Sequence, residues 1–144
     1  MRHARRIGSV AGRVSYGGVM EVLASRVLLR PTDLERSRAF YRDTLKLPIF
    51  REFATPAGTG TVFFIGGGYL EVSGHADAPP AEGIELWLQV RDIETTRREL
   101  DGVRVLREPR REPWGLIEMW IADPDGLRIC VVEVPGDHPM RRRD

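Results

Sequence analysis

The chain has 144 residues, of which 42% are hydrophobic and 30% charged, proportions that are ordinary for one globular domain. Its 22 lysines and arginines nearly balance 21 aspartates and glutamates, so the net charge of +1 gives no reason to expect nucleic acid or an anionic membrane as a partner. The single cysteine, Cys130, excludes an internal disulfide, and no apolar run approaches the roughly 20 residues that span a bilayer, so we expect a cytoplasmic protein.

The two ends of the chain differ from the rest in composition. Residues 1–19 are basic, rich in glycine and free of acidic residues, but they lack the continuous apolar stretch of a secretory signal. We expect a flexible extension there, and composition leaves a transit peptide or a natural start at Met20 open as alternatives. Residues 140–144 are expected to form a solvated basic tail after a single domain of residues 20–139.

Residues 22–74 are expected to form a first module that begins with a strand and a capped helix. Apolar and charged residues alternate over residues 26–30, which predicts the strand. Thr32 and Glu35 have the spacing of a capping box, so a helix should begin there and continue to Leu45. The remaining strands of this module are expected at Ile49–Phe53, Thr61–Ile65 and Tyr69–Ser73.

A turn-rich segment at residues 75–83 should connect this module to a second one at residues 84–135. The second module again reads as strand, helix and three strands, with a tight turn at Asp123–Gly126. Its elements are expected at Ile84–Val90, Asp92–Leu100 (the helix), Val103–Glu108, Leu116–Ala122 and Leu127–Val134.

The two modules repeat each other at an offset of 59 residues. RVLLRPTDLERSR (residues 26–38) lies over ELWLQVRDIETTR (residues 85–97). The same offset places GGYLEV (residues 67–72) over GLRICV (residues 126–131). Because about 50 residues bury too little apolar surface alone, the modules are expected to share one core.

Alternation gives the strands an aliphatic face and a polar face. The aliphatic residues are expected to pack under the helices: Val27, Leu29, Leu70, Val72, Leu86, Leu88, Ile129 and Val131. The opposite face carries Arg26, Leu28, Arg30, Tyr69, Glu71, Ser73, Glu85, Trp87, Gln89, Arg128 and Cys130. Charged side chains are rarely buried without a partner. This face is therefore either a ligand-binding surface, which the charge in both copies favours, or the solvated side of a two-sided sheet.

Two segments resemble the vicinal oxygen chelate superfamily, which includes glyoxalase I, extradiol dioxygenases and bleomycin-resistance proteins. They are RPTDLERSRAFYRDTLKLPIF (residues 30–50) and EPWGLIEMWIADPDGLRICVVEVP (residues 112–135), and the resemblance covers about Leu23–Pro135. It implies an α+β fold in which two tandem βαβββ modules form a cupped mixed β-sheet. It also implies a homodimer.

The resemblance places the family's metal positions at Arg26, Glu71, Glu85 and Cys130. Arginine has no acceptor atom and cannot bind a metal, which leaves two carboxylates and one soft thiolate ligand. The histidines lie in the tails and the linker: His3, His75 and His138. We therefore expect no metal or other cofactor, with a divalent metal at a non-standard site as the alternative.

If the modules form one cup, the Arg26 guanidinium should occupy the place of a metal and pair with Glu71 or Glu85. The alternative is that Arg26 points to solvent. Aromatic side chains beside carboxylates indicate an aromatic or cationic organic ligand, although the tryptophans could equally fill the core. Cys130 has no histidine beside it, which favours a small buried residue over a nucleophile. The expected ligand-binding residues are Arg26, Leu28, Arg30, Tyr69, Glu71, Glu85, Trp87, Gln89, Trp120 and Cys130.

Two classes of function follow from these residues. The first is a metal-free protein that binds or sequesters a drug or metabolite, and the missing histidines favour it. The second is a lyase, isomerase or dioxygenase that uses a non-standard metal site, or Glu71 or Glu85 as a general base. Phosphate-binding loops, zinc-ligand spacings and nucleic-acid-binding motifs are all missing from the sequence.

Overall fold

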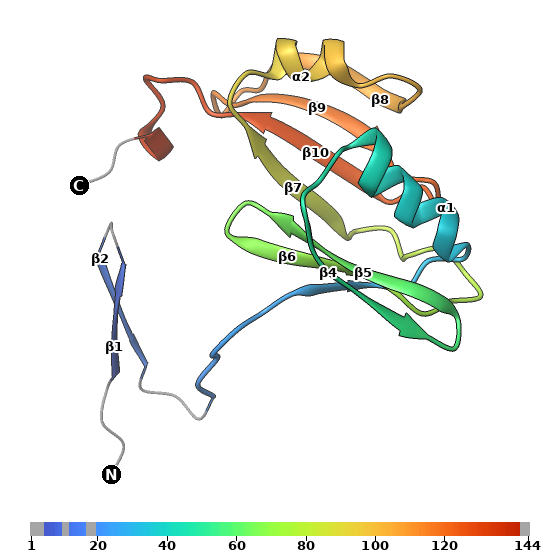
Figure 1. Ribbon diagram of the computed structural model, residues 1–144. Helices are drawn as coiled ribbons and strands as arrows, with labels where there is room; N and C mark the ends of the chain where they lie inside the picture. The colour runs from blue at the N-terminus through green and yellow to red at the C-terminus, as the bar shows by residue number, and fades with distance from the viewer. Residues whose placement is uncertain (1–4, 10–11, 17–19, 142–144) are drawn as a thin grey trace.

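The computed structural model describes residues 5–9, 12–16 and 20–141, which form two four-stranded mixed sheets, a hairpin and short helices (Figure 1). The first module contains β3 (Val27–Leu29), α1 (Leu34–Ala39), η1 (Phe40–Thr44), β4 (Ile49–Thr55), β5 (Gly58–Ile65) and β6 (Gly68–Val72). The second module contains β7 (Glu85–Val90), α2 (Ile93–Glu99), β8 (Arg104–Arg111), β9 (Ile117–Ala122) and β10 (Arg128–Glu133). No helix among the described residues is long and apolar enough to cross a membrane.

The two sheets have the same strand order, β3-β6-β5-β4 and β7-β10-β9-β8. In each sheet the first strand of the module is parallel to the last one, and the other pairs are antiparallel. The helices α1 and α2 begin 59 residues apart, at residues 34 and 93, as do β5 and β9 at residues 58 and 117. Two tandem βαβββ modules are therefore confirmed.

The start of α1 differs from the capping box that the sequence predicts. The N-cap is Asp33, whose side chain accepts the backbone N–H of Arg36 at 3.1 Å. The Thr32 hydroxyl donates instead to Asp125, in the tight turn of the second module. The predicted helix is also not uniform, because α1 continues after Ala39 as the π-helical turn η1.

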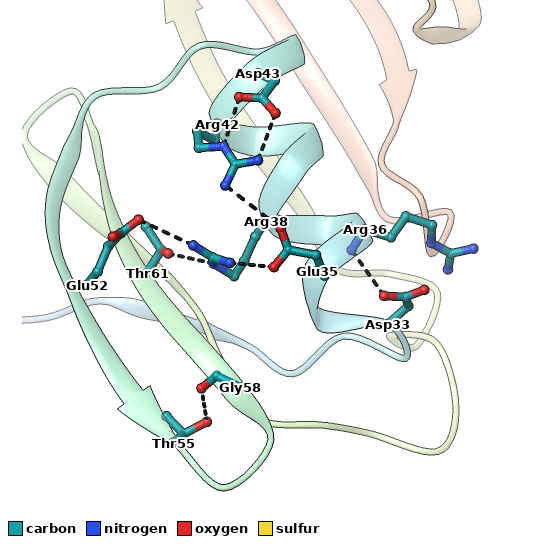
Figure 2. Close-up of polar contacts among 10 residues, drawn as sticks. All are labelled: Asp33, Glu35, Arg36, Arg38, Arg42, Asp43, Glu52, Thr55, Gly58 and Thr61. Atoms are coloured by element: carbon teal, nitrogen blue, oxygen red, sulfur yellow. Dashed lines mark hydrogen bonds and ion pairs between the residues drawn. The ribbon is translucent and has the colours of Figure 1, made fainter.

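A buried arginine holds α1 against the first sheet. The Arg38 side chain is 8% exposed, and its guanidinium donates to three acceptors (Figure 2). Nε donates to the Thr61 hydroxyl on β5 at 2.8 Å and Nη2 to Glu52 on β4 at 3.3 Å, while Nη1 pairs with Glu35 one helical turn away. Since an unpaired buried cation is costly, these contacts fix the helix relative to β4 and β5.

One apolar cluster is shared by both modules. It contains Leu29, Leu34, Tyr41, Phe63, Leu70, Val72, Leu86, Ile93, Met119, Ile121, Leu127, Ile129 and Val131. The shared core and most of the expected aliphatic face are thus confirmed, with Leu88 half-buried against the cluster. The expectation is wrong for Val27, which is 42% exposed because β3 is an edge strand that pairs only with β6.

Polar contacts join the two modules at the tight turn Asp123–Gly126, and we call this set the inter-module contact. The Tyr41 hydroxyl donates to the buried Asp123 carboxylate at 2.8 Å. Asp125 accepts the backbone N–H of Thr32 at 2.9 Å and pairs with Arg36 at 3.1 Å. The second module therefore binds the beginning of α1 directly.

Parts of both chain ends lie within the described residues. Within residues 1–19, β1 (Arg5–Ser9) pairs with β2 (Gly12–Tyr16) in antiparallel register. The expected tail from residue 140 overlaps a short 3-10 helix, η2 (Pro139–Arg141), and Arg141 Nε donates to the Val134 carbonyl at 2.7 Å. The rest of these expectations concerns residues 1–4, 10–11, 17–19 and 142–144, outside the described residues.

Candidate functional site

Each sheet has one face of side chains that alternate with the core residues and point away from it. The module 1 face consists of Arg26, Leu28, Arg30, Phe50, Arg51, Phe53, Gly60, Val62, Phe64, Tyr69, Glu71 and Ser73. The module 2 face consists of Glu85, Trp87, Gln89, Arg107, Glu118, Trp120, Arg128, Cys130 and Val132. All ten sequence-predicted ligand residues lie on these two faces.

Glu71 on β6 is the centre of the charged cluster on the module 1 face. Its Oε1 accepts Arg26 Nη1 at 2.9 Å, while Oε2 accepts the Ser73 hydroxyl at 2.6 Å and Arg30 Nη1 at 3.4 Å. The Ser73 hydrogen bond, helped by the two guanidinium groups, holds the pKa of Glu71 below its ordinary value against the opposing effect of desolvation. The predicted pairing of Arg26 with a glutamate is confirmed.

Glu85 does not join that cluster in the single chain. It lies directly opposite Arg128 in the parallel register of β7 and β10, and Arg128 Nε donates to its carboxylate at 2.7 Å. Glu85 also lines a separate depression, next to Gly83 and Gly126. The expectation that one cavity holds both glutamates with Arg26 is therefore wrong for one chain, because register gives each carboxylate an arginine on its own sheet.

The module 2 face is organised around Trp120 on β9. The guanidinium carbons of Arg107 and Arg128 lie 3.9 and 4.6 Å from the centroid of the Trp120 ring. The chain also pairs Arg107 with the buried Glu112, which directly follows β8. Arg107 is not among the expected ligand-binding residues, because the expected polar face of the second module was taken from β7 and β10 and not from β8.

Glu118 and Cys130 form a buried pair beside this ring. Cys130 Sγ donates to Glu118 at 3.4 Å, and Trp114 Nε1 donates to the same carboxylate at 2.7 Å. Burial, with Glu118 beside it, raises the pKa of the Cys130 thiol to about 12. A thiol with so high a pKa is a poor nucleophile at neutral pH, and Cys130 is 2% exposed, as expected of a small buried residue.

The module 1 face also carries an aromatic cluster, in which Tyr69 is an expected ligand-binding residue and Phe50 and Phe64 are not. The ring centroids of Phe50, Phe64 and Tyr69 lie 5.1–5.5 Å apart. A bulge in β4 between Ile49 and Arg51 turns Phe50 towards the other two rings, and simple alternation does not predict such a bulge. Phe64 lines a depression of about 430 Å³ together with Trp87 and Gln89 from the second sheet.

The four positions that match the family's metal ligands do not fit a metal in the single chain. Arg26 has no acceptor, Cys130 is buried with its proton towards Glu118, and the two glutamates are ion-paired in separate depressions. Among the described residues, no group of three or more His, Cys, Asp and Glu side chains is placed so that it could hold a metal ion.

Comparison with known proteins gives a consistent result for the fold. A sequence model of the glyoxalase/bleomycin resistance protein/dioxygenase superfamily matches residues 24–131. A protein of unknown function from Agrobacterium tumefaciens str. C58 has a TM-score of 0.65 and 21% identity over 82% of this chain and 97% of its own. A superfamily member from Sphaerobacter thermophilus DSM 20745 has a TM-score of 0.61 and 23% identity over 80% and 98%.

A lactoylglutathione lyase from Agrobacterium tumefaciens is also similar, with a TM-score of 0.56 and 19% identity over 81% of this chain and 96% of that chain. At these identities the solved structures are informative about the fold alone. A search of functionally curated proteins finds no match to the chain.

Proposed function

Because the chain belongs to the glyoxalase/bleomycin resistance protein/dioxygenase superfamily, we propose that it binds a small organic molecule on its polar faces without a metal ion. The observation that carries this proposal is the pair of salt bridges, Arg26–Glu71 at 2.9 Å and Arg128–Glu85 at 2.6 Å, at the family's metal positions. Each glutamate that a metal would need already pairs with an arginine. Binding through arginine and aromatic side chains is the chemistry that remains.

We further propose that the working form is a homodimer in the cytoplasm. The strands β3 and β7 are edges of their sheets, so each has one row of backbone groups that no other described strand pairs with. Beside these edges, Leu28 and Trp87 are 52% and 45% exposed. In a twofold dimer, β7 of each copy could lie against β3 of the other, which would cover the four open edges. Each such contact would join the module 1 face of one copy to the module 2 face of the other in one cup.

The test is a ligand screen on metal-depleted protein. Protein treated with a chelator should be stabilised by at least one compound of a metabolite and antibiotic library, because a ligand that binds only the folded state raises the unfolding midpoint. Zn²⁺, Mn²⁺, Ni²⁺ and Fe²⁺ should leave that midpoint unchanged. One tightly held metal per chain, lost in the Glu71→Ala variant, would contradict the proposal.

An enzymatic role as a lyase, isomerase or dioxygenase has less support from the geometry. A general base needs a lone pair directed at the substrate and a pKa near neutrality. Glu71 instead accepts from three donors, which keep its pKa low. Glu85 accepts two guanidinium nitrogens of Arg128, at 2.7 and 2.6 Å.

A further inference from the structure

The module 1 face contains an open depression large enough for a small organic ligand. Its volume is about 500 Å³, within the range of small-molecule sites in proteins. Arg30, Phe53, Glu71 and Ser73 line it, so a cation and an aromatic ring border the same space. The charge of this face and the position of these two side chains indicate what it accepts.

Positive charge exceeds negative charge on this face. Three arginines, Arg26, Arg30 and Arg51, lie on it beside a single carboxylate, that of Glu71. Glu52, which follows Arg51, points to the other side of the sheet and pairs with Arg38 there. Glu71 already accepts two guanidinium groups and one hydroxyl, so its charge is used within the face. The arginines would repel a cationic ligand, and Glu71 is already paired and cannot compensate for this repulsion.

Arg30 is held in place and still has donors to offer. Its stem runs against Gly74, where an added Cβ would lie 3.0 Å from Arg30 Cδ. Nη1 reaches Glu71 at 3.4 Å, a weak contact, and the side chain is 46% exposed. Nη1 donates to Ser73 and Glu71, and no described residue accepts a hydrogen bond from Arg30 Nε or Nη2, so the guanidinium keeps donors for a planar acceptor such as a carboxylate.

Phe53 supplies an aromatic surface beside this fork because residue 60 has no side chain. A Cβ at Gly60 would lie 2.7 Å from Phe53 Cζ and 2.9 Å from Ser73 Cβ. The end of the Phe53 ring therefore lies close to the backbone of β5 and next to Ser73, the residue that Arg30 contacts. Arg51 adds positive charge at the same place, 5.0 Å from the ring centroid.

We infer that the ligand of this chain is an aromatic carboxylate whose acid group pairs with Arg30 and whose ring lies against Phe53. This inference rests on the proposed function and gives it a chemical class. The sequence indicates an aromatic or a cationic ligand. The inference specifies an aromatic ligand with a negative charge.

Three probes that share a naphthalene ring and carry an anionic, a cationic or a neutral polar substituent test the inference. Titration calorimetry at neutral pH would compare 2-naphthoate, 2-naphthylmethylammonium and 2-naphthalenemethanol on the full chain. Naphthoate should bind at least about tenfold more tightly than the ammonium compound, with the alcohol between them. Arg30→Gln should remove most of that preference, whereas Arg30→Lys, which keeps the charge, should retain part of it.

Matched variants separate the local effect from general charge and folding effects. Arg104→Gln removes an exposed arginine from β8 on the other sheet and should leave naphthoate binding unchanged. Phe53→Leu should weaken naphthoate and the alcohol by a similar factor, because both lose the ring contact.

Tighter binding of the ammonium probe, no binding of any probe, or equal losses in Arg30→Gln and Arg104→Gln would overturn the inference. A library ligand that is not an aromatic acid would also overturn it and leave the proposed function intact. A library without any stabilising compound would contradict the proposed function itself.

Discussion

At the scale of single residues, a buried acid connects the two modules. Asp123 accepts the Tyr41 hydroxyl at 2.8 Å and the backbone N–H groups of Asp125 and Leu127, each at 2.9 Å. Burial raises the pKa of Asp123 above its ordinary value, although all three hydrogen bonds act in the opposite direction. The carboxylate therefore depends on these donors to stay ionised in the interior.

Removing one of those donors should destabilise the fold. Tyr41→Phe leaves Asp123 Oδ2 without the hydroxyl that it accepts, and we expect a loss of about 1–3 kcal/mol in the free energy of unfolding at pH 7. Urea unfolding measures this loss. Tyr69→Phe, on the module 1 face, is the control and should stay close to the parent. Equal stability of the Tyr41→Phe variant and the parent would mean that the contact contributes nothing.

At the scale of elements, the two helices begin with aspartates at equivalent places in the repeat. Asp33 and Asp92 are 59 residues apart, and each accepts backbone N–H groups from the first turn of its helix. For Asp92, hydrogen bonding from Thr95 is the main reason why the pKa is lowered from its ordinary value of 3.8. An ionised carboxylate at a helix N-terminus is favourable for the same reason.

The contribution of Asp92 should depend on pH in a defined direction. A lowered pKa in the folded state means that the cap stabilises fully above about pH 4 and is lost as the pH falls through the folded-state pKa. Asp92→Ala should thus lower the thermal midpoint by a few degrees at pH 7 and by much less near pH 2. Asp92→Asn keeps an acceptor that does not titrate, so its midpoint relative to the parent should improve in acid. A constant difference between Asp92→Ala and the parent over this range would contradict the assignment.

The sequence predicts where the strands lie, but it does not predict which residues on neighbouring strands come into contact. Periodicity locates each strand of the two sheets within a few residues, because one buried face demands alternation. It does not locate the bulge after Ile49, because an extra residue reverses the phase of alternation and the irregular pattern of β4, IFREFAT, does not show where this happens. Periodicity also does not predict the ion pair between Glu85 and Arg128. Alternation assigns a residue to a face, and only the register of β7 against β10 places Arg128 opposite it.

At the scale of the whole molecule, the two polar faces belong to sheets that are joined by their aliphatic sides. The shared core lies between the modules and the inter-module contact fixes one end of α1, so the faces that carry Glu71 and Glu85 have no ion pair in common among the described residues. Glu71 and Glu85 line separate depressions in the single chain, and the proposed dimer would bring the two carboxylates into one cup.

Sedimentation should detect that second chain. We expect a dimer at micromolar concentration, and Leu28→Lys should shift it towards the monomer because it places a charge beside the open edge of β3. Leu106→Lys is the control, since Leu106 is 42% exposed on β8, the opposite edge of the other sheet. A parent protein that sediments as a monomer, or equal effects of the two variants, would count against the proposed dimer.

The inter-module contact has a consequence for how this chain can be divided. The segment at residues 75–83 joins two halves of similar topology, which suggests that each half could be produced as a separate fragment. Yet the turn that binds Thr32 and Tyr41 occurs in the second half alone, because the residues 59 positions before Asp123 and Asp125 are Phe64 and Gly66. The duplicated halves are thus no longer interchangeable. If the chain were cut in this linker, the first half should associate with the second half through this turn. Two copies of the first half could not form the same contact.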